Sequence, residues 1–280
     1  MSRHTSFGVG GPADLYAEPN TEDDLLGLLR FAAENSVPWL ALGGGTNLLV
    51  SDLGIRGLVI RLGGGFDFAR FNGARLVAGA AASLSSVAKM AVERSLAGLE
   101  GVATVPGSVG GGVIMNAGTD AGWVGDTLTR VRVVSADGVR DLSRKEIEIR
   151  YRTTALQSSG GIVTEAEFHL RPGKREDLIA EVERMCRHRL REHPQEGGTA
   201  GCTFKNPRND HAGWMLERAG AKGMRAGGAI VSDKHANFVL NAGDATAADI
   251  LELTRRMRDL VKEKLGVTLE YEIRLVGDWD

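Results

Sequence analysis

The chain has 280 residues, of which 42% are hydrophobic and 25% are charged. This composition excludes a disordered or fibrous protein, and the length is enough for about two domains with separate cores. A formal net charge of −2 gives no electrostatic basis for binding nucleic acid or anionic lipid.

The cysteine count and the hydropathy pattern bear on the compartment. Only Cys186 and Cys202 are present, too few for a disulfide framework and typical of a reducing environment. No apolar run approaches the roughly 20 residues that span a membrane, and the first residues do not resemble a signal peptide. We therefore expect a cytoplasmic protein that does not insert into a membrane.

Helical and strand patterns alternate along the chain up to residue 191. Thr21 and Ser83 are each expected to cap a helix, because apolar residues recur at helical spacing after them. The other elements expected here are a buried strand at 39–42, strands at 128–135 and 162–170, and a helix at 175–191. In the strand at 162–170, alternate residues from Ile162 to Leu170 are expected to share one face.

Glycine is the compositional outlier, with 38 residues, and two glycine-rich segments stand out. The sequence GGGTNLL at 43–49 can turn successive N–H groups toward one anion, although a run of three glycines is also an ordinary tight turn. The sequence TVPGSVGGGVIMNAGT at 104–119 is read as a second loop, whose backbone could lie against a flat or phosphorylated ligand. This second segment lacks the Gly-Lys-Ser/Thr of a Walker loop.

The last third of the chain opens with the sequence AGCTFKNP at 200–207. It places a thiol that can release a proton in a small polar loop, and a small buried hydrophobe is the alternative reading of Cys202. A helix is expected at 213–220 and a strand at 235–240. Thr246 and Asp249 form the pattern of a capping box before another helix.

A final strand is expected at 267–275, with apolar residues on one face. Glu270, Glu272 and Arg274 would then share the other face, as functional groups or as ordinary solvent-facing charges. The six histidines show no His-Glu-x-x-His pattern, so no metal site is expected.

Eight motifs occur in a fixed order over nearly the whole chain. They are TSFGVGGPAD, GGGTNLL, VPGSVGGGVIMNAG, the pair Tyr151-Arg152, AGCTFKNP, AGAKG at 219–223, VSDKHANFVLN at 231–241 and LEYEIRLVG at 269–277. Together they resemble the UDP-N-acetylenolpyruvoylglucosamine reductase family in its shorter subtype. Several ordered motifs are far more specific than any one of them.

The resemblance implies an α+β fold, in which a vanillyl-alcohol-oxidase/PCMH-type FAD-binding domain of two subdomains precedes a smaller α+β substrate-binding domain. The expected boundaries are 1–65 for the first subdomain, with the C-terminal strand returning toward it, 66–195 for the second with its connector helix, and 196–280 for the substrate-binding domain. The resemblance further implies that FAD is bound non-covalently and that NADPH is the hydride donor. The reaction it implies is the reduction of UDP-N-acetylglucosamine enolpyruvate to UDP-N-acetylmuramate for peptidoglycan synthesis.

The resemblance also assigns catalytic roles. Arg152 and Glu272 are expected beside the substrate carboxylate, where fixed donors stabilise developing negative charge. A charged Glu272 would repel that charge, so it is expected to act protonated or through a hydrogen bond. Cys202 is expected to supply the final proton, at a position where the family commonly has serine. A thiol has a reference pKa of about 8.5, below that of an alcohol, so the departure is chemically mild.

Binding roles follow from the same motifs. The substrate is expected to contact Tyr151, Lys205, Asn206 and Lys222, although Lys222 could equally be a solvated turn residue. The residues expected to bind FAD are Gly43, Gly44, Gly45, Thr46, Asn47, Leu48, Pro106, Gly107, Ser108, Gly110, Gly111, Asn116 and Gly118. His235 and Asn237 fit either core support or substrate contact.

Three further expectations complete the interpretation. The protein is expected to be a monomer, with a small-molecule substrate and no nucleic-acid partner. The alternative function is another FAD-dependent oxidoreductase on the same scaffold, acting on an alcohol or a sugar. A nucleotide-binding or flavin-storage module without catalysis is a third possibility, against which the joint presence of Arg152, Cys202 and Glu272 argues.

Overall fold

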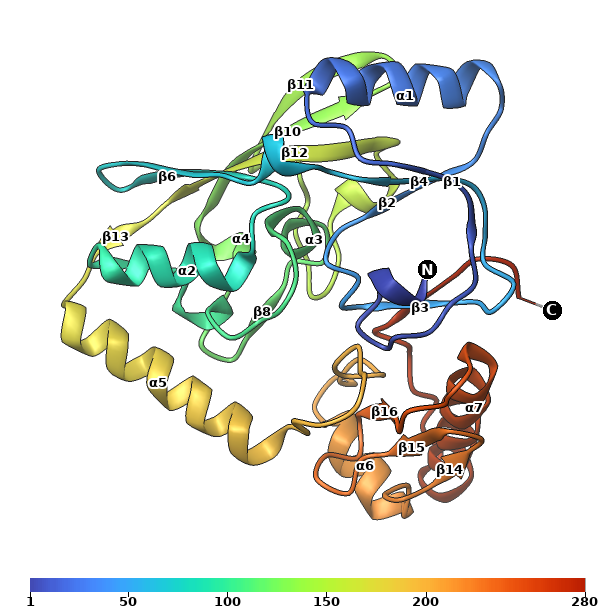
Figure 1. The fold of residues 1–280 in the computed structure, drawn as a ribbon. Coiled ribbons are helices and arrows are strands. Elements are labelled where there is room, and N and C mark those ends of the chain that lie inside the picture. Colours follow the sequence, from blue (N-terminus) through green and yellow to red (C-terminus); the bar gives the residue numbers. More distant parts are fainter. Residues whose placement is uncertain (280) are drawn as a thin grey trace. The chain divides into compact units, whose positions relative to one another are not determined.

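The computed structural model describes residues 1–279 (Figure 1). Contacts within the chain divide it into two compact units. The first unit comprises Met1–Asp14, Gly45–Arg56 and His188–Asp280, and the second comprises Leu15–Gly44 and Gly57–Arg187. The chain thus passes between the units several times. The boundary expected at residue 65 would separate two FAD-binding subdomains, and the boundary expected at residue 195 would separate the FAD-binding region from the substrate-binding region. Those boundaries stay predictions.

Two larger sheets form the frame of the second unit. One has the strand order β1-β4-β2, and the other has the order β11-β10-β12-β6-β5 with antiparallel neighbours. Their strands are β1 (Ala13–Ala17), β2 (Trp39–Leu42), β4 (Ile55–Arg61), β5 (Ala69–Asn72), β6 (Arg75–Gly79), β10 (Leu128–Ser135), β11 (Gly138–Ser143) and β12 (Gly161–His169). Two short pairs join β7 (Leu96–Ala97) to β13 (Arg171–Pro172) and β8 (Gly118–Thr119) to β9 (Gly122–Trp123).

The helices of this unit begin at the expected caps. Thr21 makes a capping box with Asp24, and the Ser83 hydroxyl accepts a hydrogen bond from the Ser86 amide. The helices are α1 (Glu22–Glu34), α2 (Leu84–Glu93), α3 (Val109–Ile114) and α4 (Val124–Thr127), with short 3-10 turns at Gly64–Phe66, Glu100–Val102 and Ala155–Ser158. Helix α5 (Arg175–Glu192) leads from the second unit into the first.

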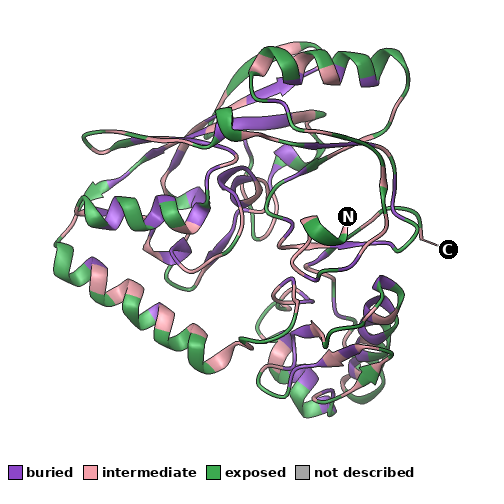
Figure 2. Cartoon of the chain, viewed as in Figure 1, coloured by how far each residue is buried: buried purple, intermediate pink, exposed green. Residues whose placement is uncertain are grey.

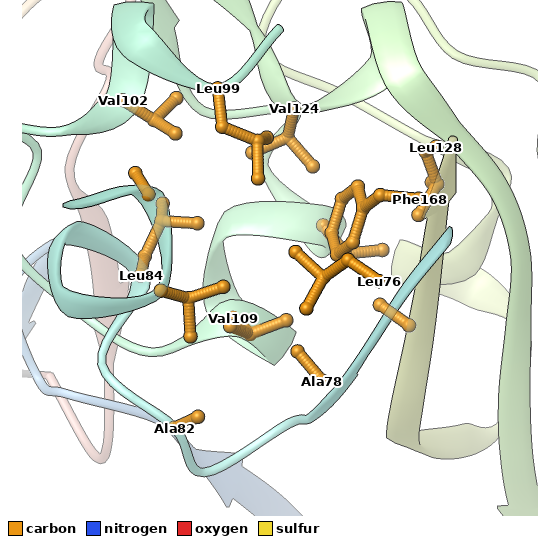
Figure 3. Packing of buried hydrophobic residues seen from close by; sticks show 14 of the residues in the cluster. Leu76, Ala78, Ala82, Leu84, Leu99, Val102, Val109, Val124, Leu128 and Phe168 are labelled. Atoms are coloured by element: carbon orange, nitrogen blue, oxygen red, sulfur yellow. The ribbon is translucent and has the colours of Figure 1, made fainter. Parts of the chain in front are cut away.

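Hydrophobic residues cover both faces of the five-stranded sheet. On one face, Leu25 and Leu29 of α1 pack with Val134 and Ile162, while the outer side of α1 is largely exposed (Figure 2). The other face is covered by α2 and α3. Figure 3 shows side chains from these helices and from the sheet meeting there, among them Leu84, Val109 and Phe168.

The expected single face of β12 is interrupted at Thr164. The register against β10 shifts between Arg132 and Val133, which leaves Thr164 as an extra residue of a bulge. Ile162 therefore packs on the α1 side, whereas Ala166 and Phe168 pack in the opposite core. All these residues are buried, but they do not share one face as the alternation predicted.

The first unit packs two helices and short strands around a second core. Its elements are β3 (Leu48–Val50), β14 (Arg225–Ala226), β15 (Ala229–Val231), β16 (Val239–Asn241), β17 (Arg274–Val276), α6 (Ala212–Ala219), α7 (Ala247–Leu265) and a 3-10 turn at Ser2–His4. Strand β17 pairs in parallel with β3. Helix α7 starts at the expected capping box of Thr246 and Asp249, and α6 ends at Gly220 with a φ of 87°.

Three sequence-based assignments were wrong in their local structure. The segment expected to be a strand at 235–240 is a regular strand only from Val239 on, after a turn and an isolated bridge between Phe238 and Cys202. Residues 267–273 are not a regular strand, although Leu269 and Ile273 are buried as the alternation required. The second glycine segment is not all loop, because it contains the short helix α3.

Candidate functional site

Backbone hydrogen bonds hold residues 200–207, here called the thiol segment because they include Cys202, between two other segments of the first unit. The Thr203 amide donates to the Asn237 carbonyl at 2.8 Å, and the Thr203 carbonyl accepts from the Glu272 amide at 2.8 Å. Thr203 is fully buried, while its neighbour Cys202 is partly exposed. Cys202 and Glu272, which are 70 positions apart in sequence, are thus joined through a single intervening residue.

The Asn237 side chain supports the same segment. Its Oδ1 accepts from the Phe204 amide at 2.9 Å, and its Nδ2 donates to the Phe204 carbonyl at 2.8 Å. Asn237 is 1% exposed, and both bonds lie in the interior. Of the two roles left open for Asn237 by the sequence, support of the fold is therefore the one that its contacts provide.

Asn47 links the first glycine segment to the segment of Glu272. Its Nδ2 donates to the Glu272 carbonyl at 3.0 Å, and its backbone carbonyl accepts from the Arg274 amide at 2.9 Å. Strands β3 and β17 continue this pairing, with Leu48 opposite Arg274. Asn47 was expected to bind the flavin, and the structure shows it also fixing the backbone of a proposed catalytic residue.

Of the residues expected to bind the substrate, Asn206 contacts the start of α6, Lys222 pairs with a residue near the end of α6, and Lys205 precedes Asn206 in the chain. The Asn206 Oδ1 accepts from the Ala212 amide at 3.1 Å. The Lys205 ammonium lies 3.4 Å from Glu270, and the Lys222 ammonium lies 2.8 Å from Glu217 of α6. These partners are largely exposed carboxylates, and such ion pairs contribute only about 0–1 kcal/mol. A diphosphate could therefore replace them at small cost.

The two glycine segments approach each other closely in the second unit. A Cβ on Gly44 would lie 2.8 Å from the Gly107 Cα, and one on Gly43 would lie 2.7 Å from the Ser108 Oγ. Gly43 and Gly44 are nevertheless exposed. Side-chain-free backbone from both segments, with a serine hydroxyl beside it, is a donor set that fits a flavin diphosphate.

Several other glycines have reasons in the fold itself. Gly45 has a φ of 65°, and a Cβ there would lie within van der Waals overlap of the His4 carbonyl, at 2.0 Å. The Gly110 amide donates to the Ala80 carbonyl at 2.9 Å, and the Gly111 amide donates to the Ser108 hydroxyl at 3.2 Å. Direct contact with FAD is not tested for these residues and stays a prediction. Of the other residues expected to bind FAD, Thr46 is partly buried, Pro106 is exposed, and Gly118 is buried.

Asn116 positions the turn that carries Tyr151 and Arg152. Its Nδ2 donates to the Arg150 carbonyl at 3.1 Å, and its Oδ1 accepts from the Gly125 amide at 2.9 Å. Arg150 pairs with Thr153 through backbone bonds in both directions, so that Tyr151 and Arg152 form the tip of a tight turn.

Arg152 itself adopts a backbone conformation that is uncommon for a residue other than glycine. Its φ is 54°, in the left-handed region. The Gln157 Nε2 donates to the Arg152 carbonyl at 3.4 Å, which helps to hold the turn. Local strain of about 1–3 kcal/mol at such positions is concentrated at functional sites.

Trp123 contacts Arg152, and the sequence reasoning did not single it out. The Arg152 guanidinium carbon lies 5.1 Å from the Trp123 ring centroid and 5.7 Å from that of Tyr151. The two aromatic rings meet edge to face with centroids 5.5 Å apart. The only signal in the sequence was a tryptophan four residues after the end of the second glycine segment, and the spacing of Trp123 from Arg152 in the chain gives no hint of contact.

His235 lies in a histidine cluster of the first unit. Its ring centroid is 5.7 Å from that of His193, which lies 6.3 Å from His188. Burial lowers the pKa of His193 to about 4, with further contributions from Arg189 and the neighbouring histidines. Burial also lowers the pKa of His235. Both rings are therefore neutral near pH 7, which suits a packed cluster.

Two further features of residues 1–279 bear on membranes and metals. The helices of this part of the chain include none that is long and apolar enough to cross a membrane. Within the same residues, no three His, Cys, Asp or Glu side chains gather in a way that could hold a metal ion.

Comparison with known families accounts for most of the chain. Residues 193–276 match the model described as UDP-N-acetylenolpyruvoylglucosamine reductase, C-terminal domain, and residues 13–143 match an FAD binding domain. Relatives named UDP-N-acetylenolpyruvoylglucosamine reductase align over the whole chain. That of Heliobacterium modesticaldum is 43% identical over 99% of this chain and 89% of its own length. The chain belongs to this reductase family.

Other members of the family agree. The reductase of Lachnoclostridium phytofermentans is 41% identical over 99% of this chain and 91% of its own length. The crystal structure of the reductase from Thermus caldophilus matches with a TM-score of 0.86 and 37% identity, covering 98% of this chain and 96% of that chain. The predicted family, the predicted fold class and the prediction of a flavoprotein reductase that uses FAD are confirmed.

Proposed function

We propose that the chain reduces UDP-N-acetylglucosamine enolpyruvate to UDP-N-acetylmuramate with NADPH, and that Arg152, Cys202 and Glu272 are the residues that carry the reaction. Family membership over the whole chain supports the activity. The observation that carries the assignment of residues is the pairing of Thr203 with Glu272, because it joins the thiol segment to the proposed carboxyl partner.

The cofactor accounts for the redox chemistry. Bound FAD would supply the redox chemistry, which is hydride transfer from NADPH to the terminal carbon of the enolpyruvyl group. The exposed backbone of Gly43 and Gly44 and the adjacent Ser108 hydroxyl would hold the FAD diphosphate.

Cys202 is assigned the proton transfer. Hydride addition leaves negative charge at the carbon that bears the carboxylate, and that carbon must receive a proton from the chain. Cys202 stands in a segment whose backbone is fixed on both sides, by the Asn237 turn and by Glu272. A thiol held in this way can meet the same face of each substrate molecule.

Arg152 and Glu272 are assigned to the substrate carboxylate. The guanidinium provides a fixed positive charge where negative charge develops, which is the condition for electrostatic stabilisation. The Glu272 backbone is fixed through Asn47 and Thr203, so its side chain has a defined origin. A protonated Glu272 can donate a hydrogen bond to the same group.

The nucleotide part of the substrate is assigned to the first unit, apart from Tyr151. Lys205, Asn206 and Lys222 gather around α6 and offer ammonium and amide donors to the diphosphate. Tyr151 is exposed at the tip of its turn and stands directly beside Arg152 in the chain. It is assigned a contact with the substrate on that basis.

The reaction places the protein in peptidoglycan synthesis, and thus in the maintenance of cell shape and in cell division. The thiol of Cys202 supports a cytoplasmic location, because a catalytic thiol must stay reduced. We assign a monomeric state. Sedimentation at micromolar concentration tests this state.

An anaerobic visible spectrum tests the function. The protein loaded with FAD is mixed first with NADPH and then with UDP-N-acetylglucosamine enolpyruvate. Loss of the flavin absorbance in the first step and its recovery in the second would support donor, cofactor and acceptor together. Recovery only with oxygen, an alcohol or a sugar would instead favour another oxidoreductase on the same scaffold.

A further inference from the structure

We propose that Trp123 is a positioning residue for the proposed substrate carboxylate site, acting through a cation–π contact with Arg152. The inference rests on the proposed function of Arg152. Trp123 lies outside the motifs that the sequence analysis singled out. Its proposed role belongs to the half-reaction in which the enolpyruvyl acceptor is reduced. Trp123, Tyr151 and Arg152 all belong to the second unit.

The first step is the geometry of the guanidinium. Its carbon lies within about 6 Å of an aromatic centroid, the range of cation–π attraction, for both Trp123 at 5.1 Å and Tyr151 at 5.7 Å. The two rings are inclined at 70° to each other. Two inclined rings restrict the guanidinium in two directions, whereas one ring would leave it free to slide.

The second step is that Trp123 is itself held firmly. Its backbone amide donates to Asp126 Oδ2 at 2.7 Å, and β9 pairs it with Gly118. A Cβ on Gly118 would lie 2.6 Å from the Trp123 Cδ2, so only glycine allows the indole to lie there. Gly118 was expected to bind FAD, and the indole provides a separate reason for glycine at this position.

The third step is that Arg152 starts from a fixed backbone. The turn is closed by Arg150 and Thr153, and Asn116 binds the Arg150 carbonyl. Asn116 and Gly118 belong to the same glycine-rich segment, so one stretch of chain fixes both the origin of Arg152 and the seat of the indole that contacts its end.

The chemical consequence concerns one half-reaction. A cation–π contact orients a guanidinium without removing its charge, unlike an ion pair with a carboxylate. Arg152 is proposed to bind the acidic group of the enolpyruvyl acceptor, so its orientation matters when that acceptor is reduced. Reduction of the flavin by NADPH does not use the acceptor and should not depend on Trp123.

The experiment compares Trp123→Leu and Trp123→Phe in anaerobic stopped-flow measurements on the FAD-loaded protein. We expect Trp123→Leu to slow reoxidation by the enolpyruvyl substrate about five-fold or more, as a contact of about 1 kcal/mol implies. Trp123→Phe keeps an aromatic face and should stay within about two-fold of the parent. Flavin reduction by NADPH should be unchanged in both. Trp39→Leu, a tryptophan change elsewhere in the same unit, should leave both half-reactions unchanged.

A double-mutant cycle with Arg152→Gln separates this inference from the proposed function. If Trp123 acts through Arg152, the slowing caused by Trp123→Leu disappears in the Arg152→Gln background. Normal reoxidation in Arg152→Gln alone would overturn the proposed role of Arg152. Two outcomes would overturn the role of Trp123 only. In one, Arg152→Gln is reoxidised slowly but Trp123→Leu is reoxidised normally. In the other, Trp123→Leu slows flavin reduction by NADPH as much as it slows reoxidation. Trp123→Met replaces the leucine variant if that protein is unstable.

Discussion

The amide of Glu272 donates a 2.8 Å hydrogen bond to the carbonyl of Thr203. Because Thr203 follows Cys202 directly, the proposed proton donor and the proposed carboxyl partner share one backbone connection. The same Thr203 donates to Asn237 on its other side, so the thiol segment cannot move without breaking buried hydrogen bonds.

Substitution of Cys202 tests the proton transfer. Cys202→Ser should keep much of the turnover, because a hydroxyl can still deliver a proton, although it is the weaker acid. Cys202→Ala should lose turnover by about 100-fold or more, yet its flavin should still be reduced by NADPH. An alanine variant that also fails to be reduced would count against this role. Alkylation should inactivate the parent protein and spare the serine variant.

Asn237→Ala tests the buried support of the thiol segment. The change leaves the Phe204 amide and carbonyl without the two side-chain bonds they now make in the interior. We expect the free energy of unfolding to fall by about 2–4 kcal/mol, which urea denaturation measures. A fall below about 0.5 kcal/mol would show that these bonds are replaced after substitution.

Gly44→Ala tests the contact between the two glycine segments. A Cβ at this position would lie 2.8 Å from the Gly107 backbone, so the segments must separate. We expect FAD to bind at least about ten-fold more weakly in a fluorescence titration, a loss of about 1.4 kcal/mol.

Gly27→Ala is the matched control for this change. Gly27 lies within α1, and a Cβ there meets nothing within 4 Å. Alanine should stabilise the helix by up to about 1 kcal/mol and leave FAD affinity as it is. Equal losses of FAD in the two variants would mean that the contact between the segments is irrelevant to binding.

Local signals in the sequence predicted much of the fold. The caps at Thr21, Ser83 and Thr246 were found because the capping side chain and the helix it caps are neighbours in the chain. The bulge at Thr164 could not be found in this way, since it depends on the register against β10. Likewise, His235 lies in a turn because its segment bonds to the thiol segment, which is distant in sequence.

In the candidate site, too, some residues could be predicted from the sequence and others could not. Cys202, Glu272 and Arg152 were predicted from ordered motifs, and their catalytic roles stay predictions. Trp123 was not identified, since its part depends on a contact with Arg152 that only the folded chain creates. The Asn237 contacts were also invisible, because a buried amide and a ligand-binding amide look alike in sequence.

We expect the free energy of unfolding to fall in mild acid because of the partly buried His193. The folded protein holds the pKa of His193 at about 4, mainly through burial, against an ordinary value of 6.5. Below pH 6.5 the unfolded chain therefore takes up a proton that the folded chain refuses, so acid favours unfolding. The stabilisation should be complete above pH 6.5, decline as the pH falls toward 4, and change no further below it. After allowance for solvent screening at this partly exposed ring, we expect a loss of about 1–2 kcal/mol.

Urea denaturation between pH 7 and 4 measures this decline, and His193→Phe isolates the contribution of the ring. Phenylalanine can pack against Phe238, whose ring lies 4.8 Å from His193, and it cannot be protonated. The variant should lose about 1–2 kcal/mol less than the parent over this range, while the exposed control His169→Gln should follow the parent curve. Because His235 lies beside His193 and its pKa is also lowered, a smaller decline should persist in the phenylalanine variant. Parallel curves for the parent and His193→Phe would mean that His193 titrates normally in the folded protein.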